Sequence, residues 1–104
     1  MNDETLSITE SISEGTCNLT AKGRIDSNSA ALLQEKLENA LKTDKKNIIL
    51  NMYEIKYLSS IGIRVILKIY KQAKETGITF NISHPSEFVK NVLGMVALKE
   101  MLVT

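Results

Sequence analysis

Two adjacent serines, Ser59 and Ser60, are the residues of this chain whose type and position could do chemistry. They precede an amphipathic segment that predicts a helix over residues 60–76. The N-terminus of a helix has unpaired N–H groups and a partial positive charge, so it accepts a hydroxyl cap and favours a phosphate. Two interpretations are therefore open: a serine only caps the helix, or a serine is phosphorylated and the added negative charge switches an interface.

Other catalytic patterns are weak in this sequence. The one histidine, His84, and the one cysteine, Cys17, fall in separate predicted elements, which disfavours a metal site or a Cys-His nucleophile. No glycine-rich phosphate-loop motif occurs, and three tyrosines with two phenylalanines are too few for a nucleic-acid stacking platform. An enzyme with Ser60 as nucleophile would need His84 as its base. We predict a non-enzymatic binding protein with no catalytic residues, no cofactor and no metal.

The predicted helix over 60–76 has two distinct faces when its residues are placed about 100° apart. Four side chains form a polar arc and four face the core: Arg64, Lys68, Lys71 and Glu75 against Val65, Ile66, Ile69 and Ala73. Ile61 falls in the polar arc beside Ser60. It is either exposed as part of a partner surface or covered by a neighbouring loop, and both alternatives are open.

Periodicity and turn residues divide the whole chain into strands and helices. The expected order is strand 4–10, strand 17–25, helix 28–42, strand 47–52, loop 53–59, helix 60–76, strand 78–82, a helix from Pro85, and a short helix or turn over 97–103. A turn at Glu14-Gly15 predicts an antiparallel hairpin, Asp26 is a candidate cap for the first helix, and Gly77 predicts the end of the second. The later strand–helix–strand units predict parallel crossovers. The predicted fold class is α/β, a small mixed β-sheet that is mostly parallel with an antiparallel edge hairpin, with helices packed on it.

Length and composition are those of a single globular domain over residues 1–104. The 104 residues are 43% hydrophobic and 24% charged, and the formal net charge of +1 gives no broad field for binding nucleic acid. The most apolar stretch, residues 61–70, contains Arg64 and Lys68 and is too short to cross a bilayer. The acidic, polar N-terminus lacks the features of a secretory signal. We therefore expect a cytoplasmic protein that binds no nucleic acid and does not insert directly into a membrane.

The order of elements and several short motifs resemble those of STAS domains, the family of bacterial anti-sigma-factor antagonists. The matching pieces extend from about Leu19 to Leu102 and include Gly23-Arg24-Ile25-Asp26, Ile48-Ile49-Leu50-Asn51-Met52, Tyr57-Leu58-Ser59-Ser60-Ile61-Gly62-Ile63, Ala73-Lys74-Glu75-Thr76-Gly77, and Pro85-Ser86 before Val92-Leu93. The family motif after the third strand is Asp-Ser-x-Gly, where x is Ser, Thr or Ala. Ser60 matches its phosphoacceptor and Gly62 its glycine, whereas Ser59 replaces the Asp and Ile61 replaces the small residue.

This resemblance implies a STAS-like fold and a regulatory cycle. The unmodified domain would bind a serine kinase that is also the anti-sigma factor and has a histidine-kinase-like ATPase fold, and the sigma factor would be released. Phosphorylation at Ser60 would end this binding, and a PP2C-type phosphatase would restore it. The implied partner-binding residues are Asp26, Ser59, Ser60, Ile61, Gly62, Ile63 and Arg64.

An alternative within the same family has no phosphorylation switch. In it the domain is a fixed STAS subunit of a larger assembly, such as a lipid transporter. Ser59 in place of the family's Asp favours this alternative, and the presence of Ser60 favours the switched antagonist.

Overall fold

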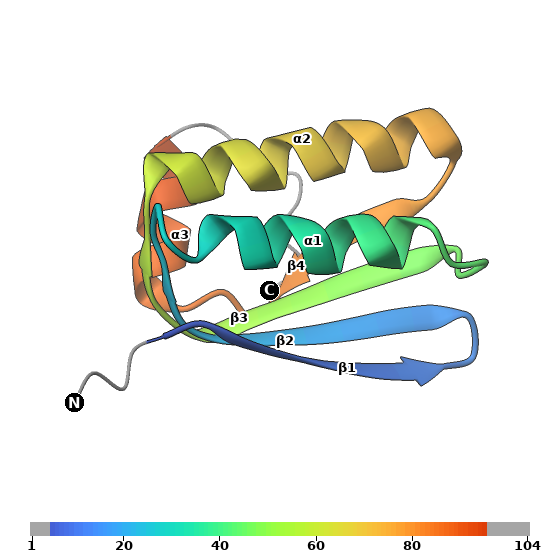
Figure 1. Cartoon of the computed structure of the whole chain (residues 1–104), viewed down its shortest axis with the longest axis horizontal. Coiled ribbons are helices and arrows are strands. Elements are labelled where there is room, and N and C mark those ends of the chain that lie inside the picture. Colours follow the sequence, from blue (N-terminus) through green and yellow to red (C-terminus); the bar gives the residue numbers. More distant parts are fainter. Residues whose placement is uncertain (1–4, 96–104) are drawn as a thin grey trace.

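In the described part of the chain, four strands form one mixed sheet and three helices pack on it (Figure 1). The computed structural model describes the backbone of residues 5–95 and the side chains of residues 5–91. Its elements are β1 (Ser7–Ser13), β2 (Thr16–Ile25), α1 (Ala30–Leu41), β3 (Asn47–Leu58), α2 (Ser60–Thr76), β4 (Thr79–Ser83) and α3 (Glu87–Met95). The predicted order of elements is confirmed, and the short helix or turn predicted over 97–103 lies outside the described residues.

The sheet has the strand order β1-β2-β3-β4, and its topology confirms the predicted fold class. β1 pairs with β2 in antiparallel orientation, whereas the β2–β3 and β3–β4 pairs are parallel. The hairpin turn lies at Glu14 and Gly15, which both have positive φ, 46° and 81°. Two such residues form the tight turn that suits the twist of a β-hairpin. β1 begins at Ser7, so the strand predicted over 4–10 was placed too early.

β3 is longer than predicted, because the segment expected as a loop over 53–59 continues the strand to Leu58. It pairs with β2 along its whole length, and the register shifts between Thr20 and Lys22 and again between Gly23 and Arg24. Each shift gives β3 one extra residue relative to β2, as in a β-bulge. The buried positions therefore change from alternate residues to Ile55 and Leu58, three apart. This broken alternation is why the sequence pattern did not indicate a strand there.

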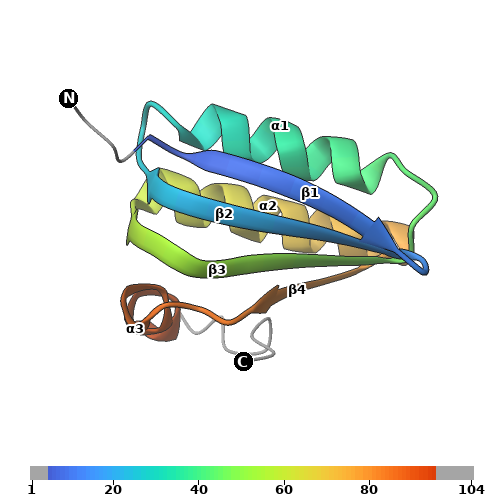
Figure 2. The same cartoon turned by 90° about the horizontal axis from the view of Figure 1, so that it is seen from below.

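α1 and α2 lie side by side on one face of the sheet (Figure 1). Figure 2 shows both helices together behind the sheet, with α3 separate from them. The core lies between this helix pair and the sheet, and its largest fully buried side chains are Leu19, Ile25, Leu33, Leu37, Ile48, Leu50, Met52, Ile55, Ile66, Ile69 and Ile82. α2 has the predicted bounds, and Gly77 ends it in the left-handed conformation with φ 77°.

α3 packs against the part of β3 that extends past the end of β4. Ser86 makes the connection, since its backbone N–H donates to the Met52 carbonyl and its hydroxyl donates to the Ile55 carbonyl at 2.8 Å. The same hydroxyl accepts the N–H of Val89 at 3.2 Å and so caps the helix. The helix begins at Glu87, two residues after the predicted start at Pro85. No helix within residues 5–95 has both the length and the apolar character that a membrane crossing requires.

Candidate functional site

The ends of β2 and β3 bring the predicted site residues to one edge of the sheet. Because the two strands are parallel, Ile25 and Leu58 pair at their C-terminal ends, and α1 and α2 both begin just beyond this pair. The backbone N–H of Ser59 donates to the Ile25 carbonyl at 2.9 Å, which ties the start of α2 to the strand before Asp26. The candidate residues at 26 and 59–64 therefore share one edge, as expected from the parallel sheet.

Ser59 caps α2. Its backbone is extended, with φ −81° and ψ 170°, and its side-chain oxygen accepts the N–H of Gly62 at 3.2 Å. Serine and aspartate are both strong caps because each has an oxygen that reaches the free N–H groups of the first turn. Ser59 therefore caps α2 as an aspartate at this position would.

Ser60 is the first residue of α2 and is exposed to solvent. The first turn contains no acidic side chain, so the positive end of the helix dipole is not balanced by a carboxylate of its own helix. Ile61 is 40% exposed, so no loop among the described residues covers it fully, and its part in a partner surface stays a prediction. The serine hydroxyl and an apolar side chain therefore lie together on the outside of the domain.

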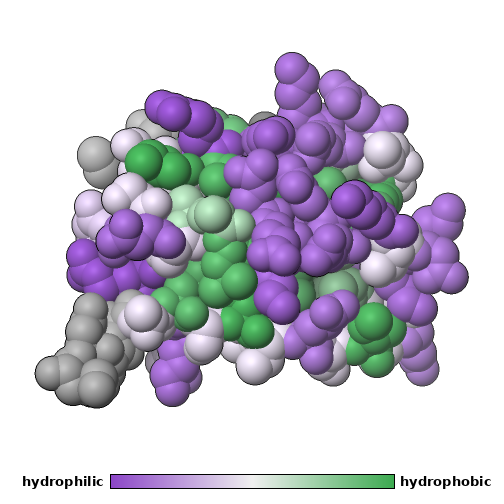
Figure 3. Space-filling view, viewed as in Figure 1, coloured by the Kyte–Doolittle hydropathy of each residue, from purple (hydrophilic) through white to green (hydrophobic). Residues whose placement is uncertain are grey.

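Two further apolar side chains of α2 reach the surface, on the other side of the polar arc from Ile61. Leu67 is also 40% exposed, and Ile63 is half-buried against the core. Figure 3 shows a hydrophobic area over the N-terminal halves of α1 and α2, bordered by hydrophilic side chains over their C-terminal halves. The predicted polar arc is confirmed, since Arg64, Lys68, Lys71 and Glu75 are all exposed.

Gly62, one of the predicted partner-binding residues, is buried. A β-carbon at this position would lie 2.5 Å from Cγ2 of Ile25 and 2.7 Å from Cδ1 of Leu58. Both distances are shorter than van der Waals contact allows, so only glycine lets α2 approach the strand ends this closely. Gly62 therefore positions the start of α2 by packing against the strand ends.

Asp26 occupies the turn between β2 and α1. Its carboxylate accepts the N–H groups of Asn28 and Ser29 at 2.9 and 3.2 Å and the hydroxyl of Ser29 at 3.2 Å. The Asn28 N–H is the main reason that the pKa of the Asp26 carboxyl is held below its ordinary value, with Ser29 and the Arg24 charge adding to it. Asp26 therefore shapes the turn before α1 and keeps a fixed negative charge near the start of α2.

One cluster on the opposite face of the sheet was missed by sequence reasoning. The Arg24 guanidinium carbon lies 4.4 Å from the centre of the Tyr57 ring, and the rings of Tyr57 and Phe88 are 5.8 Å apart. These are ordinary distances for cation–π and aromatic contacts. The sequence pattern predicts a loop over residues 53–59, and a loop gives no reason to expect that Tyr57 pairs with Arg24.

The structure does not bring His84 to Ser60. Ser83, at the end of β4, pairs with Asn51, and β3 then continues to Leu58 before Ser60 is reached. This part of the strand is about 20 Å long at 3.3 Å per residue, which is far beyond hydrogen-bond reach. The arrangement required for a Ser60 nucleophile with a His84 base is therefore not formed. Between residues 5 and 95, no group of three or more His, Cys, Asp or Glu side chains converges as a metal site would require.

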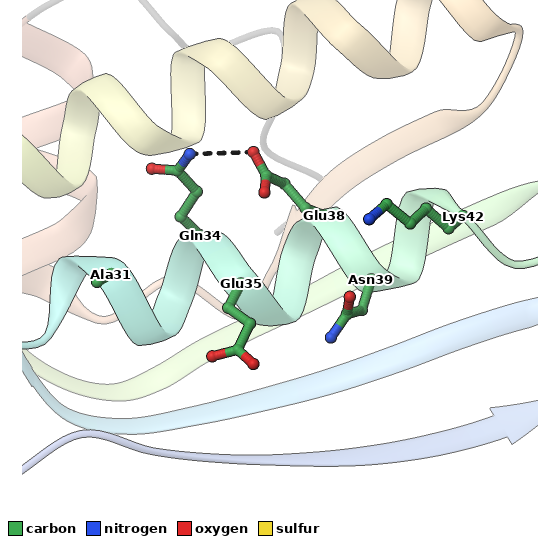
Figure 4. A pocket seen from close by; sticks show the side chains of 6 residues that line it. All are labelled: Ala31, Gln34, Glu35, Glu38, Asn39 and Lys42. Carbon is green, nitrogen blue, oxygen red and sulfur yellow. Dashed lines mark hydrogen bonds between the residues drawn. The ribbon is translucent and has the colours of Figure 1, made fainter.

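The outer face of α1 is polar and differs from the surface around Ser60. An open hollow of about 430 Å³ runs along it, and its lining residues are Ala31, Gln34, Glu35, Glu38, Asn39 and Lys42 (Figure 4). Gln34 donates a hydrogen bond to Glu38 at 3.0 Å, while Glu35 and Asn39 point away from this pair. These side chains satisfy one another or face solvent, which is typical of a solvated helix face.

A family model for the STAS domain matches residues 7–104. The chain belongs to the STAS domain family. Similar solved structures include that of the anti-sigma factor antagonist SpoIIAA in its unphosphorylated form, with a TM-score of 0.81, 16% identity, and coverage of 93% of this chain and 86% of that one. An anti-sigma factor antagonist from Mycobacterium paratuberculosis has a TM-score of 0.85 and 16% identity over 98% of this STAS domain and 86% of its own chain.

A third structure is that of the Bacillus cell fate determinant SpoIIAA in the phosphorylated form. Its TM-score is 0.75 and its identity is 15%, over 93% of this chain and 89% of that one. At these identities the likeness concerns the fold. The predicted membership of the STAS family is confirmed, and the solved structures of this fold include antagonists of anti-sigma factors.

Proposed function

We propose that this STAS domain is an anti-sigma-factor antagonist switched by phosphorylation at Ser60. In the unmodified form it binds a serine kinase that is also the anti-sigma factor, and the sigma factor is released. The kinase transfers the terminal phosphoryl group of ATP to Ser60, and the modified domain dissociates. A PP2C-type phosphatase hydrolyses the phosphoserine and resets the cycle.

The observation that carries this proposal is the exposed hydroxyl of Ser60 beside the exposed Ile61 on a STAS domain. A kinase must reach the acceptor oxygen, and a partner that buries Ile61 must also cover that oxygen. The same surface can therefore be recognised by the partner and altered by its kinase activity. Arg64 lies one turn farther along α2 than Ser60, and Asp26 borders the surface on the α1 side. Ile63 is half-buried and lies on the opposite flank of the helix from Ile61.

Ser60 is a better acceptor than its neighbour Ser59. The Ser59 oxygen accepts the Gly62 N–H, and a phosphate on that oxygen would disturb the helix cap. Among the hydrogen bonds of the described residues, none involves the Ser60 side chain, and Ser60 is exposed where Ser59 is half-buried. Modification of Ser60 therefore leaves the cap intact.

Phosphorylation would act on the interface and leave the fold in place. The phosphate adds a charge of about −1.5 to −2, and the positive end of the α2 dipole stabilises it in the free domain. In a complex, the same charge would be buried against the partner surface that covers Ile61, where desolvation is costly. The free modified domain is thus favoured over the complex.

A pull-down from native lysate tests the proposal with three immobilised forms: the unmodified chain, Ser60→Asp and Lys71→Asp. The Lys71 variant is the matched control, because it changes the charge in the same direction on the same helix but lies about 16 Å farther along it. We expect the unmodified chain and the control to retain an ATPase with kinase activity, and Ser60→Asp to lose it. Incubation of the recovered kinase with ATP should phosphorylate Ser60, as read by mass spectrometry.

Two outcomes would contradict the proposal. Equal recovery of the kinase by all three forms would mean that position 60 does not control binding. Recovery of transporter subunits by all three forms would instead support the alternative of a fixed STAS subunit, for which Ser60 needs no modification.

A further inference from the structure

Arg64 is an exposed cation close to Ser60. It follows Ser60 by four residues on α2, and its guanidinium forms no ion pair among the residues that the structure describes. Lys71 also forms no ion pair among the described residues, but it lies about 16 Å farther along α2 than Ser60. Two other cations of α2 have partners. Lys68 lies 3.9 Å from the Glu38 carboxylate, and Lys74 lies 5.3 Å from the centre of the Tyr70 ring.

Residues four apart on a helix lie on the same face, with their β-carbons about 5–6 Å apart. An anion placed N-terminal to a cation at this spacing is the favourable order, because it agrees with the helix dipole. The planar guanidinium also matches a phosphate group through two parallel N–H···O bonds. Helix geometry alone therefore brings the Arg64 fork within reach of a phosphate on Ser60.

We propose that Arg64 is the intramolecular counter-ion of phosphorylated Ser60. This rests on the proposed function, in which Ser60 is the acceptor. In the unmodified domain Arg64 points outward and is available to an acidic group of the partner. In the modified domain the guanidinium binds the phosphate. Phosphorylation then removes a cation from the contact surface at the same time as it adds an anion.

Other charged groups also act on a phosphate at Ser60. The Asp26 carboxylate, on the turn between β2 and α1, is anionic and opposes a phosphate at the same sheet edge. Arg24 is bound over the Tyr57 ring on the opposite face of the sheet. Lys68 is one turn beyond Arg64 and forms an ion pair with Glu38. Arg64 is thus the cation on α2 best placed for the phosphate.

The inference can be tested on the whole chain with phosphoserine incorporated at position 60 during translation, so that no kinase is needed. A phosphorus NMR titration then gives the second pKa of the phosphate. In the Arg64→Gln variant this pKa should rise by about 0.3 relative to the phosphorylated parent chain. Arg64→Lys should recover part of the shift, because it keeps the charge but loses the planar fork. Lys71→Gln is the matched control and should leave the phosphate pKa unchanged.

Two further measurements check that the shift in the phosphate pKa is electrostatic. Asp26→Asn should lower the phosphate pKa, since it removes the opposing carboxylate. Raising the salt concentration to about 1 M should remove most of the difference between the parent chain and Arg64→Gln, because an exposed pair is screened. Chemical shifts of the folded core confirm that each variant is folded.

A phosphate pKa that is the same in the parent chain, Arg64→Gln and Lys71→Gln would overturn the inference. The proposed function would survive that result, because it depends on whether Ser60→Asp abolishes partner binding. Conversely, a shift caused by Arg64 in a chain that no kinase phosphorylates would support the pairing and contradict the proposed switch. The two failures are therefore distinguishable.

Discussion

Replacing Gly62 with alanine should destabilise this domain, although alanine is the better helix former. In an exposed helix interior the change from glycine to alanine stabilises by about 1 kcal/mol. At position 62 the new methyl group would lie 2.5 Å from the Ile25 side chain and 2.7 Å from the Leu58 side chain. Ile25 is 0% exposed and Leu58 is 3% exposed, so neither has open space to move into.

The size of the effect follows from these opposing terms. Overpacking of a closed core costs typically about 1–3 kcal/mol, and the short Ile25 contact is with a branched side chain whose χ1 is stiff. After the helix-propensity gain is subtracted, we expect a net loss of up to about 2 kcal/mol. For a domain of this size that corresponds to a fall in Tm of up to roughly 10 °C.

Urea denaturation followed by circular dichroism measures the free energy of unfolding. Ser60→Ala is the matched control, because it changes an exposed residue of the same helix turn and should alter stability by less than about 0.5 kcal/mol. Leu58→Ala should cost less in the Gly62→Ala background than in the parent chain, since it removes one of the two colliding groups. A Gly62→Ala variant that is more stable than the parent, with additive effects of Leu58→Ala, would refute the reasoning.

Three other perturbations have expected outcomes. Ser60→Asp should stabilise the domain by roughly 0.3–1 kcal/mol at low salt through the α2 dipole, and an unchanged urea midpoint would contradict this. The folded-state pKa of Asp26 is lowered, so its ionised form contributes stability that is present above the ordinary value of 3.8 and is lost as pH falls through the folded pKa. The Asp26→Asn variant should therefore lose less stability than the parent chain on acidification below about pH 4. If the free energy of unfolding falls equally with pH in both proteins, the ionised Asp26 carboxylate does not stabilise the fold. Burial, and then the hydrogen bond to Glu10, raises the pKa of Cys17 to about 11, so a thiol reagent at pH 8 should label it only in urea; rapid labelling without urea would show that the thiol is accessible.

Local patterns in the sequence were sufficient to predict α2 and the first hairpin. The 3.6-residue periodicity of α2 separated its core side from its polar arc, and Gly77 marked its end. Glu14 and Gly15 marked the hairpin turn. These features depend on neighbours within a few residues, because helix faces, caps and tight turns are determined by nearby backbone geometry. The sequence leaves the exposure of Ile61 open, because a neighbouring loop could cover its side chain.

Contacts between distant segments determine the length of β3 and the burial of Gly62, which local sequence patterns do not predict. The length of β3 depends on its pairing with β2 through two register shifts, which erase the alternation that local reading requires. The burial of Gly62 depends on how closely α2 approaches Ile25 and Leu58.

Residues close together along the chain are enough to predict the order of elements, the amphipathic α2 and the serine pair at its start. Long-range contacts are needed to show that Ser59 is bonded to the Ile25 carbonyl and caps the helix while Ser60 stays exposed. They also place Arg24 against Tyr57 on the opposite face of the sheet. Parallel pairing of β2 with β3 is the physical reason, since it places the ends of two strands that are separated by a whole helix at the same edge of the sheet.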